Sequence, residues 1–329
     1  MAVILIGIIV ITKLNNEQSE DKQLSSGYSL LIRRMDKIDN NANILNYPYV
    51  SKKENKQEVS IQHLKDVLFS FWDGEILNDE QYPQGICLTE EYLIVTSYAD
   101  SKNTFGECKV FDKHTGEHLV TLGMDKKSHL GGISYDGKNI WVCNSPRMEI
   151  ERISFAFVQG AISNHRGGFV DITNLMEGYR VDNLPSSLFY YDGKLYVSTH
   201  TKWNNSKMIS YFYDEQKNCL VKTDVYTIPA KVQGVALDDE ERVYVSSSYG
   251  RENSSYLKIY SSLEDMHRNV NAYIEMIEMP PCSEGLVWED EKLYILFESA
   301  GKKYIEGTDG KGRSVSPLDR ILIIDRASP

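Results

Sequence analysis

Two glutamates in the C-terminal third have the residue type and spacing for acid–base chemistry. Glu284 opens one apolar segment and Glu298 closes the next, so a hairpin of two strands would bring the two carboxyl groups to the same end. Burial and like-charge repulsion would then raise one pKa and give an acid and base pair. A calcium ion near Glu284 is a second interpretation, with Glu284, the side chains of Gln84 and Gln233 and backbone carbonyls as its oxygen ligands. A third interpretation is that these groups only hydrogen-bond to one another and to water in a narrow channel.

The segment that carries Glu284 is the last of five similar segments. Each has a small residue, an apolar stretch, an acidic or glycine turn, a tight apolar strand and then a Ser or Thr. The copies begin at Pro83, Leu130, Pro185, Val232 and Ser283, and the marker residues of their second strands are Ile94, Trp141, Tyr196, Tyr244 and Tyr294. The marker spacings of 47, 55, 48 and 50 residues match one four-stranded propeller blade of about 40–50 residues.

Each copy has the turn and strand signals of a blade. Asp136-Gly137 and Asp192-Gly193 are typical of tight hairpins, because the glycine supplies a positive φ. Third strands are predicted at Cys108 to Phe111, Arg152 to Phe155, Met208 to Phe212, Tyr256 to Tyr260 and Arg320 to Ile324, and outer strands at His118 to Leu122 and Val225 to Ile228.

A ring of blades leaves two sheet edges unpaired unless its first and last blades share strands. The alternating segment Val67 to Trp72 precedes the first inner strand, so we expect it to complete the fifth blade beside Arg320 to Ile324. The sequence therefore predicts an all-β fold, a five-bladed β-propeller closed by an N-terminal strand. Two separate domains are the alternative, but the regular spacing disfavours them.

Polar residues recur where the inner strands begin and the second strands end. These positions meet at one mouth of a propeller channel, so they are the candidate ligand-binding residues. They are Gln84, His129, Asn144, Ser186, His200, Gln233, Tyr249, Arg251, Glu284 and Glu298. Arg251 beside Tyr249 suits binding of a carboxylate or stacking on a ring, whereas His129 and His200 lack the spacing of a zinc site. The run from Gly307 to Gly312 lacks the phosphate-binding motif and is interpreted as a flexible loop.

The N-terminus has the profile of a membrane-targeting segment. An apolar run from Ala2 to Ile11 precedes Lys13 and a polar stretch. It is shorter than the ~20 apolar residues of a spanning helix, and the basic region and cleavage site of a secretory signal are missing. We expect a hydrophobic anchor or signal segment at residues 1–14, a polar tether at 15–62 and an extracytoplasmic propeller at 63–329; the alternative is that the run forms a buried strand.

Composition narrows the classes of partner. The 329 residues carry 36 Lys and Arg against 47 Asp and Glu, a net charge of −11, which repels phosphate backbones and disfavours nucleic acid. Five scattered cysteines contain no CxxC pair, so they are interpreted as buried free thiols and not as a disulfide framework.

Two resemblances bear on function. The segment VQGVALDDEERVYVSSSYGRENSSYLKIY, Val232 to Tyr260, resembles the repeat of the plant-type glutaminyl cyclases, which implies a five-bladed propeller with Gln84, Gln233, Glu284 and Trp288 near a central pocket. PPCSEG and FESAGKKY, at Pro280 to Gly285 and Phe297 to Tyr304, are similar to segments of uncharacterised membrane-anchored five-bladed propellers of Gram-positive bacteria. That second resemblance implies no reaction.

Three hypotheses follow for function. The first is a membrane-tethered propeller that binds a small molecule, glycan or peptide at its channel mouth. The second is an enzyme, a glutaminyl-cyclase-like acyltransferase or a hydrolase, that uses Glu284 and Glu298. The third is a scaffold that docks another protein on its side surface.

Overall fold

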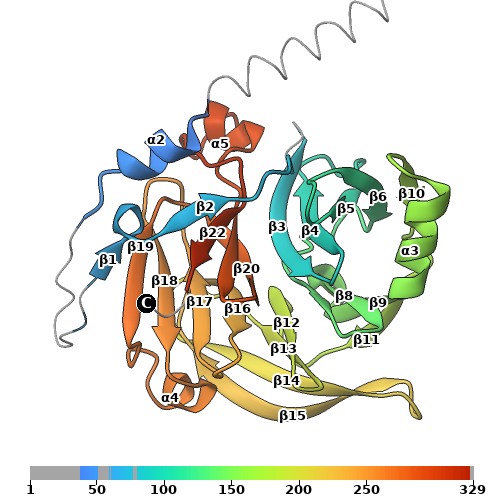
Figure 1. The fold of residues 1–329 in the computed structure, drawn as a ribbon. Helices are drawn as coiled ribbons and strands as arrows, with labels where there is room; N and C mark the ends of the chain where they lie inside the picture. The colour runs from blue at the N-terminus through green and yellow to red at the C-terminus, as the bar shows by residue number, and fades with distance from the viewer. Residues whose placement is uncertain (1–37, 51–58, 60, 77–79, 327–329) are drawn as a thin grey trace, which may run out of the picture. The chain divides into compact units, whose positions relative to one another are not determined.

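The chain folds into a five-bladed β-propeller, as the sequence predicts (Figure 1). The computed structural model describes residues 38–50, 59, 61–76 and 80–326. Contacts divide the chain into the units Met1–Asp39 and Asn40–Pro329, and the propeller belongs to the second. The predicted anchor at residues 1–14 lies outside the described residues; among those described, no helix has the length and apolar character needed to cross a membrane.

Each blade is built on antiparallel strands that follow one another in chain order from the channel outward, and strands from elsewhere in the chain add to the outer edges of blades 1, 4 and 5. Blade 1 contains β3 (Gln81–Leu88), β4 (Tyr92–Ala99), β5 (Gly106–Asp112) and β6 (His118–Met124). Blade 2 contains β7 (Ile133–Tyr135), β8 (Asn139–Asn144), β9 (Glu149–Ser154) and β11 (Glu177–Arg180), and blade 3 contains β12 (Ser187–Tyr191), β13 (Lys194–Ser198), β14 (Ser206–Asp214) and β15 (Cys219–Ile228). Blade 4 contains β16 (Val232–Leu237), β17 (Val243–Ser247), β18 (Ser255–Tyr260) and β19 (Glu275–Met279), and blade 5 contains β20 (Ser283–Glu289), β21 (Lys292–Phe297) and β22 (Leu322–Asp325).

The predicted hairpins form where the Asp-Gly pairs stand. Asp192 and Gly193 both have positive φ angles, 45° and 75°, which is the backbone of a type I′ turn between β12 and β13. In blade 2 the Asp136 carboxylate accepts hydrogen bonds from the backbone of Lys138 and Asn139 and from the Trp141 indole at 2.6 Å. The marker residue of this repeat therefore fixes the turn that precedes it.

Blade 2 contains an insertion that explains the longest marker spacing. The third strand β9 ends at Ser154, one residue earlier than predicted, because the Ser154 hydroxyl caps α3 (Phe155–Asn164) by accepting from the Phe157 N–H. After α3 the chain forms β10 (Phe169–Asp171), which pairs in parallel with β6 of blade 1. The blade's own outer strand β11 follows only then.

The ring is closed by an N-terminal strand in the predicted place. β2 (Phe69–Phe71) pairs antiparallel with β22, with Phe69 opposite Ile324 and Phe71 opposite Leu322. Trp72 follows it, packs edge-on against Phe111 of blade 1 at 5.5 Å between ring centroids, and donates its indole N–H to the Lys113 carbonyl at 2.8 Å. The closing strand thus joins blade 5 to blade 1.

A second N-terminal segment, residues 40–50 with 61–66, packs on blades 4 and 5; we call it the strap. It contains α2 (Asn40–Leu45), β1 (Ile61–His63), which pairs in parallel with β19, and the 3-10 turn η1 (Leu64–Asp66). Ile44 is fully buried in the blade core. The buried Glu278 carboxylate accepts from the Val50 N–H at 3.1 Å and from the Ser254 hydroxyl at 2.5 Å. This part of the range predicted as a tether is therefore packed against the propeller.

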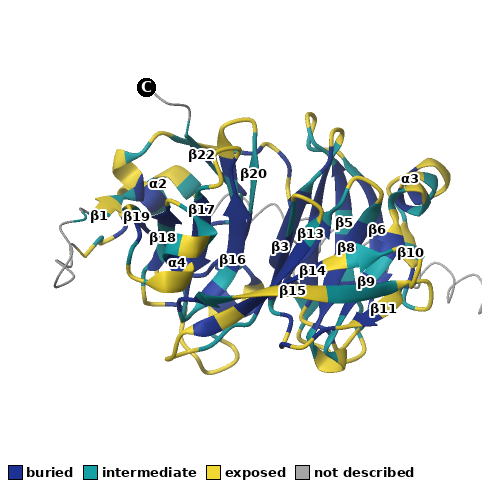
Figure 2. Cartoon of the chain, turned by 90° about the horizontal axis from the view of Figure 1, so that it is seen from below, coloured by how far each residue is buried: buried dark blue, intermediate teal, exposed yellow. Residues whose placement is uncertain are grey.

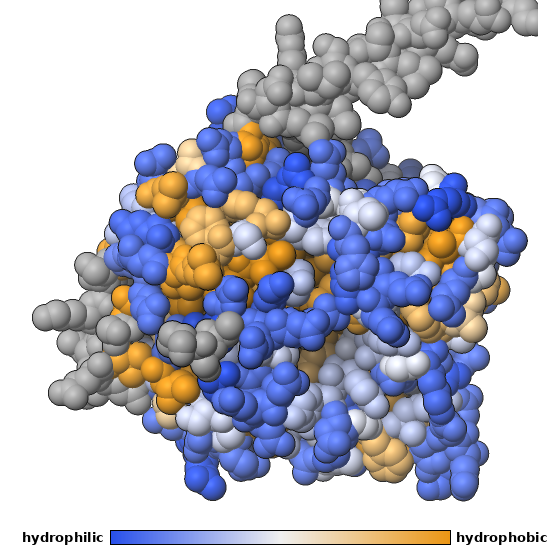
Figure 3. Space-filling model, viewed as in Figure 1, coloured by the Kyte–Doolittle hydropathy of each residue, from blue (hydrophilic) through white to orange (hydrophobic). Residues whose placement is uncertain are grey.

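The hydrophobic core lies between neighbouring blades. Figure 2 shows that inner strands such as β3 and β16 are buried, whereas β15 at the rim of blade 3 is exposed or half-buried up to its last residue. On the face seen in Figure 3 hydrophobic side chains gather over β2 and β22 and again over β10 and α3. All five cysteines are free thiols, of which four are buried and Cys219 is half-buried. The short helices α4 (Leu263–Arg268) and α5 (Lys302–Glu306) lie in connections of blades 4 and 5.

We predict that Trp72→Ala lowers the free energy of unfolding by about 3–5 kcal/mol, because it removes a buried indole from the closure. Trp203→Ala is the matched control: that indole is 78% exposed, and its loss should change stability by less than about 0.5 kcal/mol. Denaturant titration followed by circular dichroism measures both. Equal effects of the two substitutions would show that the closing strand does not hold the ring together.

Candidate functional site

Backbone bulges place the polar residues of three inner strands at the channel mouth. The pairing register shifts between Pro83 and Gly85, between Val232 and Gly234, and between Ser283 and Leu286. The residues inside these shifts include Gln84, Gln233 and Glu284. A bulge bends its strand and re-aims a side chain, so each of these three residues leaves the ordinary alternation. Blades 2 and 3 have the small residues Gly131 and Ser186 at the corresponding positions.

The three side chains meet Glu298, which follows the end of β21. Gln84 donates its amide N–H to Glu298 Oε2 at 2.9 Å, and Gln233 donates its amide N–H to Glu284 Oε1 at 2.9 Å. Glu284 and Glu298 hydrogen-bond to each other, and the Tyr304 hydroxyl donates to Glu298. The predicted carboxyl pair is therefore brought together, with one glutamine on each member.

Both carboxyl groups of the pair have raised pKa values. Burial raises the pKa of Glu284 well above its usual range, and the charge of Glu298 and the hydrogen bond between the two carboxyl groups raise it further. Burial also raises the pKa of Glu298, but the Tyr304 hydroxyl and the Lys303 ammonium oppose that shift. Glu284 is thus the member of the pair that keeps a proton more readily, and Glu298 is the member that ionises first.

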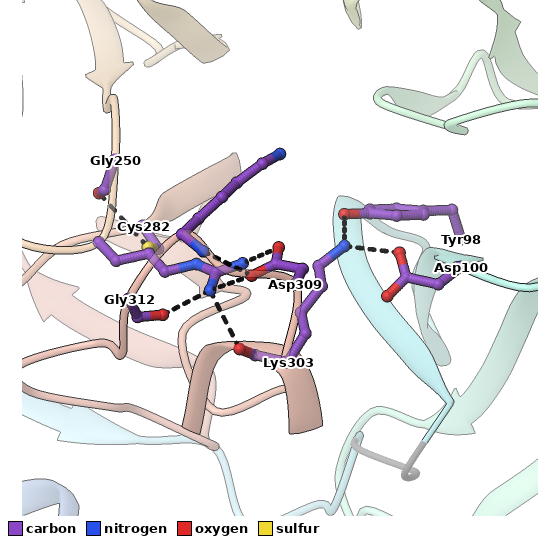
Figure 4. Close-up of polar contacts among 9 residues, drawn as sticks. Tyr98, Asp100, Gly250, Cys282, Lys303, Asp309 and Gly312 are labelled. Atoms are coloured by element: carbon purple, nitrogen blue, oxygen red, sulfur yellow. Dashed lines mark hydrogen bonds and ion pairs between the residues drawn. The ribbon is translucent and has the colours of Figure 1, made fainter. Parts of the chain in front are cut away.

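Lys303 forms the opposite wall of the mouth. Its ammonium donates to the Tyr98 hydroxyl at 2.6 Å and to Asp100 at 2.8 Å (Figure 4). It also lies 4.0 Å from the centroid of the Tyr82 ring and 4.6 Å from that of Tyr98. The lysine is buried, and an ion pair and cation–π contacts offset its desolvation.

Arg251 binds a carboxylate and stacks on a ring, and both groups belong to the chain itself, Asp309 and Tyr304. Its guanidinium makes two hydrogen bonds to the Asp309 carboxylate, donates to the Lys303 and Gly312 carbonyls, and lies 4.2 Å from the Tyr304 ring centroid. These contacts pin the long loop after α5 to blade 4. The predicted flexible loop from Gly307 to Gly312 is therefore held at two points by one side chain.

The two histidines lie at the mouth without forming a metal site. His129 stacks on Tyr98 at 3.9 Å between ring centroids. The protein atoms around the His129 ring desolvate it and lower its pKa to about 4, and the Lys303 charge adds to this shift. The ring is therefore neutral at pH 7. His200 Nδ1 donates to the Val232 carbonyl at 3.1 Å.

Within the described ranges no three His, Cys, Asp or Glu side chains are grouped so that they could hold a metal ion. Calcium near Glu284 would also need both glutamines to turn their carbonyl oxygens inward, because each now presents its NH₂ group to a carboxylate. The donor set as arranged does not fit calcium.

A cavity of about 400 Å³, which we call the mouth cavity, collects most of the predicted site. Of the residues proposed from sequence, it is lined by His200, Gln233, Tyr249, Arg251, Glu284 and Glu298. Its volume lies in the range of ~300–1,000 Å³ that small-molecule sites occupy. Gln84 and His129 adjoin it through their contacts with Glu298 and Tyr98.

Three residues proposed from sequence lie elsewhere. Asn144 is buried in blade 2, where its amide donates to Glu151 at 2.8 Å. Ser186 belongs to the close contact between blades 2 and 3, where its carbonyl lies against Gly131. Trp288, which the glutaminyl cyclase resemblance implied near the pocket, stacks on Tyr244 at 5.3 Å between blades 4 and 5.

Sequence reasoning missed the residues of the mouth that lie outside the repeat. They are Cys282, Lys303, Tyr304, Asp309 and Lys311. Four of them lie in the connection between β21 and β22, where Lys303 and Tyr304 belong to α5. The adjacent lysine and tyrosine in this connection were the available signal.

Comparisons with known proteins support the fold alone. No family model matches the chain, and no curated protein matches it. Similar solved structures include the tail fiber of Staphylococcus aureus phage P68, with 10% identity, a TM-score of 0.51 and coverage of 81% of this chain and 54% of that one. Hydrazine synthase of Kuenenia stuttgartiensis (11% identity, TM-score 0.36, 69% and 58% coverage) and a nidogen–laminin complex (10%, 0.38, 65% and 72%) are more distant in structure.

The raised pKa of Glu284 predicts a pH-dependent cost to stability. Above the usual glutamate range the unfolded chain releases a proton that the folded chain retains, so stability falls as pH rises through the interval between the two pKa values. Glu284→Gln removes this titration. We expect the variant to gain stability over the native protein between pH 5 and pH 8, by on the order of 1 kcal/mol.

Denaturation midpoints across that pH range test the prediction. Glu289→Gln is the control on the same strand, because its carboxylate instead pairs with Lys113 at 2.9 Å; this substitution should bring no gain at pH 8. A native protein that becomes more stable relative to Glu284→Gln as pH rises would contradict the assignment of the proton.

Proposed function

We propose that this propeller binds a small hydrogen-bonding ligand in the mouth cavity, with Glu284 and Glu298 as its floor. The observation that supports this most directly is a buried pair of carboxyl groups, each hydrogen-bonded to a glutamine, at the base of an open cavity. A protonated Glu284 donates, an ionised Glu298 accepts, and the amide of Gln233 offers both functions. Hydroxyl and amide groups of a glycan, a peptide or a small metabolite match such a set.

At the floor of the mouth cavity the charges favour binding by hydrogen bonds, although Lys202 and Lys311 also line the cavity. Arg251 is neutralised by Asp309, and Lys303 by Asp100. A ligand that reaches the floor therefore meets one net carboxylate, several neutral donors and acceptors, and the rings of Tyr98 and Tyr304. Burial there strengthens each hydrogen bond, because the local dielectric is low.

We predict that a ligand of this site raises the melting temperature of the native protein and not that of Glu284→Gln. A ligand present at 100 times its dissociation constant adds about 2.7 kcal/mol to stability. Glu151→Gln is the matched control, since Glu151 is a buried glutamate of blade 2 that hydrogen-bonds to Asn144 outside the cavity; this variant should keep the shift. A screen of oligosaccharides, peptides and nucleotides by thermal unfolding measures it.

Two outcomes would count against the proposal. A shift that survives in Glu284→Gln places the ligand elsewhere. Thermal curves unchanged by every ligand class favour the scaffold hypothesis, in which a protein partner docks on the side surface.

Catalysis by the same pair is a second candidate, and the specific observation in its favour is the shared proton. Glycoside hydrolases keep their two carboxyl groups at least about 5 Å apart, whereas Glu284 and Glu298 hydrogen-bond directly. The arrangement instead suits an acid and base that exchange one proton, as in acyl transfer or hydrolysis at a peptide end. Catalysis requires turnover that Glu284→Gln abolishes, whereas Glu151→Gln should leave it intact.

We further propose that residues 1–14 attach the chain to a membrane with the propeller on the extracytoplasmic side. The support is the apolar run from Ala2 to Ile11 followed by a polar stretch. Fractionation of the producing cells should recover the full chain with membranes and a version starting at residue 15 in the soluble fraction. Protease added to intact spheroplasts should digest the full chain. Protection from the protease would show that the propeller lies on the cytoplasmic side instead.

A further inference from the structure

A second cavity of about 590 Å³ opens beside the mouth cavity, and the two share Ser248 and Tyr249. The strap contributes Tyr47 to its wall, blade 3 contributes Trp203, and blade 4 contributes Lys231 and Ser254. The Tyr47 and Ser254 hydroxyls hydrogen-bond to each other at 3.0 Å. The strap thus does more than pack on the propeller, because it forms one side of a cavity adjoining the proposed site.

Tyr249 lies at the boundary of the two cavities and carries cations on its ring. Lys202, which lines the mouth cavity, is 5.4 Å from the ring centroid, and Lys231, which lines the second cavity, is 5.7 Å from it. The Trp203 ring lies 6.2 Å from the Tyr249 ring and is 78% exposed. Two neighbouring aromatic faces flanked by lysines therefore connect the cavities.

The positive charge at this boundary is available to a ligand. Within the part of the chain that the structure describes, no ion pair is formed by Lys202, by Lys231 or by Lys311 at the lip of the mouth. Glu252 is the carboxylate that lines the second cavity. At the Tyr249 ring, Lys202 and Lys231 thus face one carboxylate, Glu252, whereas Lys311 shares the mouth cavity with Asp309, Glu284 and Glu298. The positive region is therefore confined to the surroundings of Tyr249 on a chain whose net charge is −11, and such a region attracts anions.

We infer that the ligand is an acidic oligosaccharide that lies across Tyr249, with one end in the mouth cavity. This inference rests on the proposed function and names its ligand class. Consecutive sugar rings would pack their apolar faces on Trp203 and Tyr249, and carboxylates on those rings would meet Lys202 and Lys231.

The floor of the mouth favours an acidic sugar over a nucleotide. Lys202 and Lys231 both lie at the Tyr249 ring, 5.4 Å and 5.7 Å from its centroid, so they can meet the anionic groups of either ligand. The floor of the mouth also contains the Glu298 carboxylate, which would repel a phosphate but accepts hydrogen bonds from sugar hydroxyls.

The test is titration calorimetry of the full chain with a tetramer of galacturonic acid and with maltotetraose as a neutral chain of equal length. We expect the acidic tetramer to bind at least tenfold more tightly at low salt, and this preference to shrink at 0.5 M salt as screening rises. The double variant Lys202→Ala/Lys231→Ala should weaken the acidic tetramer at least tenfold and leave maltotetraose unchanged. Trp203→Ala should weaken both.

Lys126→Ala is the matched control, since Lys126 lies 4.2 Å from the Phe105 ring centroid in blade 1, away from both cavities. This variant should bind the acidic tetramer as tightly as the native protein does.

Binding of any ligand that requires Glu284 but does not depend on Lys202 and Lys231 would overturn this inference and leave the proposed function standing. Lysine-dependent binding of an acidic peptide or a nucleotide, without binding of the acidic tetramer, would overturn the assignment to a sugar. If the binding of no ligand depends on Glu284, both this inference and the proposed function are wrong.

Discussion

The structure depends on how closely the five inner strands approach one another around the channel. Four of them carry glycine at the contact, and a side chain there would collide with a neighbouring backbone: a Cβ on Gly132 would lie 2.4 Å from Leu188 N, and one on Gly285 would lie 2.6 Å from the Gln84 carbonyl. Blade 3 has Ser187 at this position. Small residues thus let five blades close into a ring without a gap, and the apolar markers of each second strand can then pack between blades.

The same close approach produces the chemistry of the mouth. Glu284 and Glu298 belong to one blade, and the close approach of the inner strands brings Gln233 of blade 4 and Gln84 of blade 1 within hydrogen-bond distance of them. The bulges in these three inner strands turn the side chains toward the axis. Each buried carboxyl group therefore accepts one amide hydrogen bond.

The repeat allowed most of the fold to be predicted. Periodicity predicts the number of blades, turn residues predict the hairpins, and the need to pair sheet edges predicts the closing strand. Each of these signals can be read from a short segment or from a spacing in the sequence. Position within the repeat also located Gln84, Gln233 and Glu284, which occupy the same place in the inner strands of blades 1, 4 and 5, where the pairing register shifts. It failed for Asn144, which has the right position but turns to Glu151 within its blade. Lys303 and the strap belong to no repeat, so their contacts depend on tertiary packing.

The asymmetry of the ring explains why the polar groups of the mouth concentrate on one side. Blades 2 and 3 have Gly131 and Ser186, which lie against each other, where blades 1, 4 and 5 have the amides and carboxyls. The irregular parts gather on that same side: the Arg251 clamp joins the loop of blade 5 to blade 4, and the strap packs on both blades. The repeated strands thus form the ring itself. The segments outside the repeat contribute Lys303 and Tyr304 to the mouth cavity and Tyr47 to the second cavity.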